Sequence, residues 1–364
     1  MPPRRNHWTI NGDFVGFKQT GVARYAREVT AALDALVGEG AASDMEIGLV
    51  APRAADGLGL AHIPVRVVPE FKPRLPQVWV QMQLPRFAPG GLVSLCNLAP
   101  VGKRRHIACI HDLHTFLMPE SYGRGFRLAH RAILPAVGRA AFRITTVSEL
   151  SKSHLIEQGV ARADKIVVAY NGADHAARWR PERAGVALGP RPFALCLAQR
   201  QKYKNIALIW RIAPALDDAG LDVYVAGDFD AAAVAALGEP TARNIRLLGR
   251  ISDDDLAAAL RAARCLLFPS RIEGFGLPMV EAMMHGCPVV ASTSPCLPEV
   301  SGGAALHVDP DDAAGWVSAV SRLHEDETLR RDLAEKGRVR AAQFTWRGVA
   351  ETYLRLMREA DAAL

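Results

Sequence analysis

The feature that most constrains this chain is a regular alternation in its second half. From 193 to 323, short apolar runs, helix-like stretches and turns recur. Such alternation is typical of βαβ units, in which a helix carries the chain back between parallel strands. It predicts a doubly wound sheet covered by helices. The expected strands are 193–198, 221–226, 244–248, 265–268 and 287–291, and the expected helices are 205–219, 230–237, 252–263, 277–285 and 311–323.

The first half shows the same kind of alternation less clearly. Ser148 is a good N-cap for a helix that begins at 149. Two further helices are expected at 328–341 and 346–363, the second of them amphipathic. The expected strands of the first half are 8–11, 47–51, 64–68, 92–95, 106–110, 143–147 and 165–169, and the helices are 21–37, 122–139 and 149–158.

The length and composition indicate two globular domains. A chain of 364 residues exceeds one ordinary core, and 49% apolar with 23% charged residues excludes extensive disorder. The stretch 173–190 has weak periodicity and reads as a linker. We therefore expect a first domain at 1–172, a second at 191–345, and a terminal helix at 346–364 that packs back towards the first domain.

The cysteines and the hydropathy favour a cytoplasmic protein. Six cysteines, none in a C-x-x-C spacing, lie mostly inside apolar runs, which predicts buried free thiols and a reducing compartment. No apolar run approaches the length of a membrane span, and the basic N-terminus lacks the apolar segment of a signal peptide.

Charge is divided unevenly along the chain. Residues 1–172 carry 21 Lys and Arg against 13 Asp and Glu, a net of +8, whereas residues 173–364 carry 23 against 25, a net of −2. A basic first half is suited to an anionic phospholipid surface or an anionic acceptor. The alternative is solvated surface charge without a partner.

Glycine-rich sequence follows the expected strand 265–268. Ligands of parallel α/β sheets bind beyond the carboxyl ends of the strands. The segment reads F-P-S-R-I-E-G-F-G-L-P-M-V-E-A-M over 268–283. Gly274 and Gly276 let the backbone approach a ligand closely, and Pro278 suits the first turn of the next helix. The free N–H groups of that helix start predict an anion site.

Two glutamates flank this helix start. Glu273 lies on the loop, and Glu281 lies one turn into the helix, near the expected anion. A carboxylate there would repel the anion unless it faces neutral hydroxyls, and a ribose diol fits because a carboxylate accepts both O–H bonds. The segment predicts a bound phosphate and ribose. The alternative is a capped surface helix with ordinary acidic residues.

The string E-G-F-G-L-P-x-x-E-A-M at 273–283 resembles the signature of retaining glycosyltransferase family 4. The resemblance continues through G-C-P-V-V-A-S, L-P-E-V and A-L-H-V-D-P between 286 and 310. It implies an α/β protein of the GT-B fold, with two Rossmann-like doubly wound domains facing across a cleft that holds the site. It also implies a nucleotide-diphosphate sugar donor, bound mainly by the second domain.

The resemblance implies a role for each matching residue. Glu281 would bind the ribose of the donor nucleotide, and Glu273 would contact the transferred sugar. The backbone N–H groups of Phe275, Gly276 and Leu277 would hold the sugar or its β-phosphate.

A basic turn follows the expected strand 193–198. It reads Q-R-Q-K-Y-K-N over 199–205, and such cations can neutralise a diphosphate leaving group. Lys204 matches the family's Lys-Asn. The family's arginine falls on a glutamine in an ungapped register, so Arg200 one place later, or Lys202, would replace it. We count Arg250, after the strand 244–248, with the donor-binding residues. The alternative is a solvated basic turn.

The first domain supplies two further matches. T-G-V-A-R-Y at 20–25 opens a helix, and Gly21 permits close approach of an anion to the helix start. His111 follows the strand 106–110 at a position where the family has a histidine near the donor sugar. We expect His111 to orient that sugar. A single histidine is otherwise more often structural.

Other functions were weighed against this one. Asp228 and Asp230 form a D-F-D string after a strand and are the only serious metal candidate, but we expect no metal and no other cofactor. No basic-aromatic array suggests nucleic acid. A sugar-nucleotide hydrolase or epimerase on a similar fold remains an alternative, as does a non-catalytic partner subunit.

The resemblance implies a retaining hexosyltransferase of cell-surface polysaccharide synthesis. Because it is to mannosyl- and rhamnosyl-type members, it favours GDP-mannose as the donor, with UDP- and dTDP-sugars as alternatives. The acceptor is expected to be a saccharide, lipid-linked, at the cytoplasmic membrane face. The segment 71–79 motivates the membrane contact because Trp79 beside basic residues suits a headgroup interface. A core-packed Trp79 is the alternative.

Overall fold

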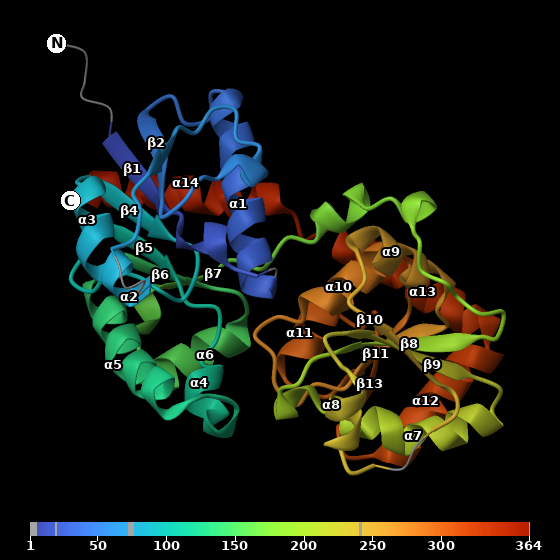
Figure 1. Cartoon of the computed structure of the whole chain (residues 1–364). Coiled ribbons are helices and arrows are strands. Elements are labelled where there is room, and N and C mark those ends of the chain that lie inside the picture. The colour runs from blue at the N-terminus through green and yellow to red at the C-terminus, as the bar shows by residue number, and fades with distance from the viewer. Residues whose placement is uncertain (1–5, 19, 72–75, 240–241, 364) are drawn as a thin grey trace. The chain divides into compact units, whose positions relative to one another are not determined.

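The computed structural model describes residues 6–18, 20–71, 76–239 and 242–363. The chain divides into two compact units (Figure 1). Unit 1 comprises Met1–Gly172 with Thr345–Leu364, and unit 2 comprises Ala173–Phe344. The division at 172 is where the sequence indicated a domain end. The 173–190 segment, however, clusters with unit 2 and does not form a separate linker.

The described strands of unit 1 form one seven-stranded, parallel sheet in the order β3-β2-β1-β4-β5-β6-β7. The strand order reverses between β1 and β4, and right-handed crossovers then place helices on both faces of the sheet. The strands are β1 (Asn6–Asn11), β2 (Met45–Ala51), β3 (Val65–Val67), β4 (Gly91–Ser94), β5 (His106–Cys109), β6 (Arg143–Thr146) and β7 (Ile166–Val168).

The main helices of unit 1 include all three that the sequence predicted. Ser148 caps its helix as expected, since its side chain accepts a hydrogen bond from the Ser151 N–H. The described helices are α1 (Gly21–Gly38), α2 (Pro76–Val78), α3 (Leu84–Phe87), α4 (His114–Leu117), α5 (Arg124–Ala140), α6 (Glu149–Glu157) and α14 (Trp346–Ala363).

The terminal helix α14 belongs to unit 1 although the whole of unit 2 separates it from the rest in sequence. It packs against α1 (Figure 1), and Trp8 donates from its indole N–H to Asp361 at 3.1 Å. Gly172 permits the approach, because a Cβ at this position would lie 2.4 Å from the Trp346 backbone nitrogen. The apolar face of α14 thus completes the core of unit 1.

Trp79 lies in that core and not at the surface. Its side chain is 1% exposed, and its indole N–H donates to the Val68 carbonyl at 2.7 Å. The expectation of an interfacial Trp79 is therefore wrong, because a tryptophan with no exposed edge cannot contact a headgroup. Lys72 and Arg74, the basic residues of the same segment, lie outside the described residues.

The described strands of unit 2 form a six-stranded, parallel sheet in the order β10-β9-β8-β11-β12-β13. Four of the strands, β8 to β11, were predicted within one residue of their bounds. The strands are β8 (Phe193–Ala198), β9 (Asp222–Gly227), β10 (Ile245–Gly249), β11 (Cys265–Phe268), β12 (Val289–Ser292) and β13 (Leu306–Val308). The helices are α7 (Ala207–Asp218), α8 (Ala231–Ala235), α9 (Asp253–Ala262), α10 (Leu277–Met284), α11 (Cys296–Ser301), α12 (Ala313–Glu325) and α13 (Glu327–Ala341).

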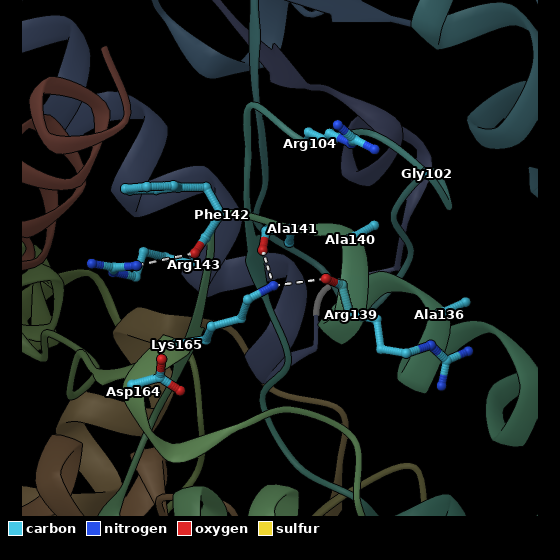
Figure 2. A pocket seen from close by; sticks show the side chains of 10 residues that line it. All are labelled: Gly102, Arg104, Ala136, Arg139, Ala140, Ala141, Phe142, Arg143, Asp164 and Lys165. Atoms are coloured by element: carbon cyan, nitrogen blue, oxygen red, sulfur yellow. Dashed lines mark hydrogen bonds between the residues drawn. The ribbon is translucent and has the colours of Figure 1, made fainter. Parts of the chain in front are cut away.

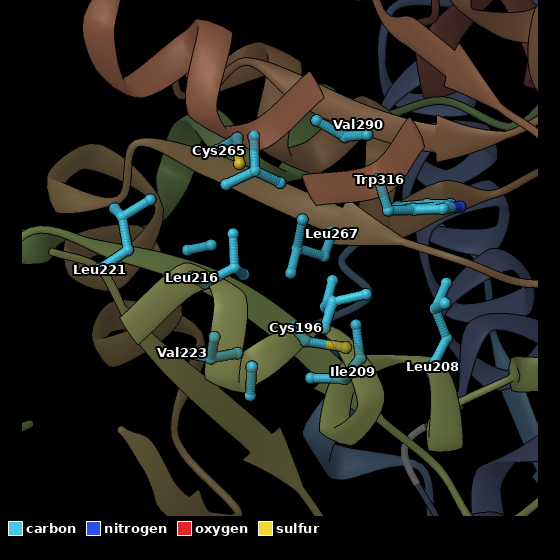
Figure 3. Close-up of a cluster of buried hydrophobic side chains, with 14 of the residues drawn as sticks. Cys196, Leu208, Ile209, Leu216, Leu221, Val223, Cys265, Leu267, Val290 and Trp316 are labelled. Atoms are coloured by element: carbon cyan, nitrogen blue, oxygen red, sulfur yellow. The ribbon is translucent and has the colours of Figure 1, made fainter. Parts of the chain in front are cut away.

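The core of unit 2 lies between its sheet and helices α7 and α12. Leu208 and Leu216 of α7 and Trp316 of α12 pack with the side chains of the central strands (Figure 3). Cys196 and Cys265 are part of this cluster, as their positions in apolar runs predicted. All six cysteines are buried and unbridged.

No helix within the described ranges is both long enough and apolar enough to span a bilayer.

Candidate donor site

The site in unit 2 is built where its strand order reverses. Strand β8 pairs with β9 on one side and with β11 on the other, so the chain leaves the two central strands in opposite directions. Lys204 follows β8 and Glu273 follows β11. Ligands of doubly wound sheets bind at this switch point, beyond the carboxyl ends of the strands.

Lys204 and Glu273 meet directly at the switch point. The Lys204 Nζ lies 2.6 Å from Glu273 Oε1, and both side chains are largely buried, at 13% and 10% exposure. The ammonium also lies over the rings of Tyr203 and Phe268, at 5.5 and 5.7 Å from their centroids. Lys204, which was predicted to bind the diphosphate, and Glu273, which was predicted to contact the sugar, are therefore direct neighbours.

The turn that carries Lys204 is fixed by unusual backbone geometry. Asn205 has φ 54° and is the only non-glycine residue with positive φ among the described residues. Its side-chain amide donates to the Pro310 carbonyl at 2.9 Å, and the Arg271 N–H donates to the Tyr203 carbonyl at 2.7 Å. The bond to Tyr203 joins the loops after β8 and β11, and the bond to Pro310 joins the loop after β8 to the segment after β13, so the turn that carries Lys204 is held beside Glu273. Asparagine tolerates the left-handed region better than most residues.

The start of α10 needs a glycine for two reasons. Gly276 has φ 89°, and a Cβ there would lie 2.7 Å from the Leu297 side chain. Pro278 occupies the first turn, as the sequence predicted. The first N–H groups of any helix lack intrahelical partners, so the α10 start supplies donors for an anion beside Glu273.

Glu281 is held by a histidine that the sequence reasoning missed. His175 Nε2 lies 2.9 Å from Glu281 Oε1, with side-chain exposures of 1% and 7%. His175 lies on a short 3₁₀ turn, η6 (Asp174–Arg178), which packs on α10. No local pattern marks this residue, because it stands alone in the segment that was interpreted as a linker.

An aromatic stack holds His175 in place. Its ring meets Trp179 edge to face at 5.5 Å, and Trp179 stacks on His285 of the α10 C-terminus at 5.3 Å. Burial lowers the pKa of His285. The 173–190 segment thus lies fixed on unit 2 and aligns the predicted ribose ligand.

Arg200 does not contact Lys204 or Glu273 in the structure. Its guanidinium forms an ion pair with Asp230 at 2.9 Å, and both side chains are more than half exposed. Such surface pairs are weak, about 0–1 kcal/mol, so a donor diphosphate can compete for Arg200. Arg250 follows β10, is exposed, and contacts no member of the Lys204–Glu273 pair. The roles of Arg200 and Arg250 stay predictions.

Asp230 and Phe229 of the D-F-D string have structural roles in unit 2. Asp230 caps α8 by accepting from the Ala233 N–H at 2.8 Å and also pairs with Arg200, while Phe229 is buried. Within the described ranges, no group of His, Cys, Asp or Glu side chains is arranged to hold a metal ion.

His111 lies after β5 in unit 1 and is almost fully buried. Its Nε2 lies 2.9 Å from the Leu95 carbonyl, and its backbone N–H donates to Asn97 Oδ1 at 2.8 Å. Burial acts to lower its pKa, but the charge of Cys109 and its hydrogen bond to the ring, the Leu95 carbonyl and the charge of Asp112 together outweigh burial and raise the pKa of His111 to about 9. The ring is engaged within unit 1, so its contact with a sugar stays a prediction.

Gly21 begins α1, which Thr20 caps by accepting from the Ala23 N–H. A Cβ at Gly21 would meet no atom within 4 Å, so nothing inside unit 1 requires glycine there. Packing within unit 1 therefore does not account for the glycine. The predicted approach of an anion to Gly21 stays a prediction.

Two doubly wound units, each with a parallel sheet covered by helices, define the GT-B fold class. The Thermosynechococcus elongatus sucrose-phosphate synthase structure has a TM-score of 0.73 at 19% identity, covering 99% of this chain and all of that one. The Anabaena Alr3699/HepE structure with UDP and glucose has a TM-score of 0.66 at 17% identity, with coverage of 99% and 100%.

Residues 191–326 match the family described as "Glycosyl transferases group 1". O-antigen chain mannosyltransferase B of Escherichia coli is 30% identical over 256 residues, which is 66% of this chain and 67% of that relative. The chain belongs to the group 1 glycosyltransferase family, and the resemblance to family 4 drawn from its sequence is confirmed.

Proposed function

We propose that this glycosyltransferase moves a hexose from a nucleotide-diphosphate sugar to a saccharide acceptor in the synthesis of a cell-surface polysaccharide. The contact between Lys204 and Glu273 beside the α10 N-terminus carries the proposal. A glycosyl phosphate places an anion next to sugar hydroxyls, and the pair offers a cation for the first and a carboxylate for the second. The polysaccharide assignment is supported by the O-antigen mannosyltransferase relative.

The proposed reaction needs charge stabilisation at the leaving group. When the bond between the sugar C1 and the phosphate oxygen breaks, its electron pair stays on the diphosphate. Lys204, with the α10 N–H groups, stabilises that charge. The acceptor hydroxyl forms the new bond on the same face, which retains configuration, and its proton passes to the leaving phosphate. No metal ion takes part in this scheme.

GDP-mannose is the first candidate donor because the relative is named as a mannosyltransferase. UDP- and dTDP-sugars are the alternatives, and the structural neighbour that binds UDP with glucose supports the first of them. A thermal-shift panel of GDP-, UDP- and dTDP-sugars tests the assignment. The expected result is the largest stabilisation by GDP-mannose, and a larger shift with another base would replace it.

The roles of the two glutamates are tested by substitution. Glu281→Ala should weaken binding of the free nucleotide diphosphate, whereas Glu273→Gln should weaken binding of the nucleotide sugar and leave the free nucleotide unaffected. Unchanged nucleotide binding by Glu281→Ala would exclude the ribose contact. Release of nucleotide at full rate without any acceptor would favour the hydrolase alternative.

The acceptor is proposed to be a lipid-linked saccharide at an anionic membrane face. The net charge of +8 over residues 1–172 supports this part of the proposal, whereas Trp79 does not, since it is buried. Charge-driven contact weakens as salt rises. Sedimentation with anionic liposomes at low salt tests it, and failure to bind them would remove the membrane contact.

A further inference from the structure

A basic pocket lies at the amino edge of the unit 1 sheet. It has a volume of about 670 Å³ and is lined by the segments that precede β5, β6 and β7 and by the end of α5 (Figure 2). His111 follows the carboxyl end of β5, so the pocket lies at the opposite edge of the sheet from it. The charged lining residues are Arg104, Arg139, Arg143, Lys165 and Asp164.

Two of these charged residues are already engaged by the protein. The Lys165 ammonium donates to the carbonyls of Arg139 and Ala141, at 2.7 and 2.9 Å, and so caps the C-terminus of α5 (Figure 2). Asp164 is bound by Arg162 through two hydrogen bonds of 3.0 and 3.1 Å. The one acidic lining residue is therefore neutralised from outside the lining.

Two guanidinium groups remain without a protein partner. The side chains of Arg104 and Arg139 form no hydrogen bond or ion pair with any residue that the structure describes, although their backbone carbonyls accept from His106 and Lys165. The neighbours of Arg104 differ in this respect: Lys103 donates to the Ala88 carbonyl, and Arg105 pairs with Asp361. Arg104 alone in this basic run is left for an external ligand.

We propose that this pocket binds a phosphate group through Arg104 and Arg139. Guanidinium groups offer paired N–H donors that match phosphate oxygens. Arg143 also lines the pocket, but it lies 4.4 Å from the centroid of the Phe142 ring and forms an ion pair with Glu359 at 3.7 Å. The phosphate comes from a lipid headgroup or from a soluble phosphate.

The proposed pocket belongs to unit 1, whereas Lys204, Glu273 and Glu281 belong to unit 2, and the proposal requires neither GDP-mannose nor a particular acceptor. The test compares Arg104→Ala/Arg139→Ala with Arg66→Ala/Arg86→Ala. The control pair removes the same charge from exposed positions of the same unit, outside the pocket. Each protein is titrated with inorganic phosphate by calorimetry and sedimented with vesicles of phosphatidylglycerol and phosphatidylcholine or of phosphatidylcholine alone.

The expected result is phosphate binding that weakens at least about tenfold in the pocket variant and stays unchanged in the control. A parallel loss of binding to the anionic vesicles identifies a lipid headgroup, and unchanged vesicle binding identifies a soluble phosphate. Equal losses in both variants, or no response of the unaltered protein to either probe, overturn the proposal. The single variants replace the double one if its unfolding midpoint drops.

Discussion

His175→Ala gives the sharpest test of how the donor site is held. The substitution removes the ring nitrogen that lies 2.9 Å from Glu281 Oε1, and it leaves the carboxylate in a position where water has little access. It also removes the edge-to-face contact between the His175 ring and Trp179. The Glu281 carboxylate should then no longer be held in one orientation. The folded unit should also be less stable, because the buried carboxylate has lost the histidine that offsets its desolvation.

The size of the effect follows from the burial of both partners. With side-chain exposures of 1% and 7%, solvent screening is small. Removing one partner of such a pair costs about 3–5 kcal/mol, because the other is left desolvated. We expect about 3 kcal/mol for His175→Ala, since η6 is short and can admit water. For a unit of this size that is a drop of roughly 6–12 °C in the unfolding midpoint.

A double-mutant cycle separates the pair from general packing. Urea unfolding of the unaltered protein, His175→Ala, Glu281→Ala and the double variant gives a coupling free energy, which we expect to be about 2 kcal/mol. His285→Ala is the matched control. It removes the ring that stacks on Trp179, but His285 Nε2 has no hydrogen-bond partner among the described atoms.

The same proteins report on function through nucleotide affinity. His175→Ala should weaken nucleotide binding about tenfold or more, whereas His285→Ala should change it much less. A coupling free energy indistinguishable from zero would refute the reasoning, since His175 would then stabilise the unit without acting through Glu281.

Three further predictions concern single positions. Lys204→Ala should lower kcat by about 10²–10³-fold in a nucleotide-release assay, and unchanged turnover would exclude its role at the leaving group. Gly276→Ala should cost about 1–3 kcal/mol in denaturant unfolding, more than Gly303→Ala, where φ is also positive but a Cβ meets no atom. The raised pKa of His111 contributes stability that is complete below its ordinary value of 6.5 and is lost as pH rises through about 9. Cys109→Ala should let burial lower that pKa, which an NMR titration of the ring measures; an unshifted midpoint contradicts this cause.

Local signals predicted the elements of unit 2 well because each is encoded by adjacent residues. The helix predicted at 252–263 is present as α9, whose start carries a capping box of Ser252 and Asp255, and β11 lies at the predicted 265–268. The sequence missed α11 and β13, which are short, and the helical segment between Pro76 and Phe87. Elements of a few residues carry too little periodicity to be distinguished from loops.

The sequence by itself determined the family and the helix start of the donor site, because Glu273, Gly276 and Glu281 lie on one continuous strand–loop–helix segment whose geometry is local. Only the tertiary structure decided what each glutamate touches. Lys204 reaches Glu273 across 69 positions, and His175 reaches Glu281 across 106. Such contacts depend on strand order and on the docking of η6, which are set by burial of the whole unit and leave no trace in a short window of sequence.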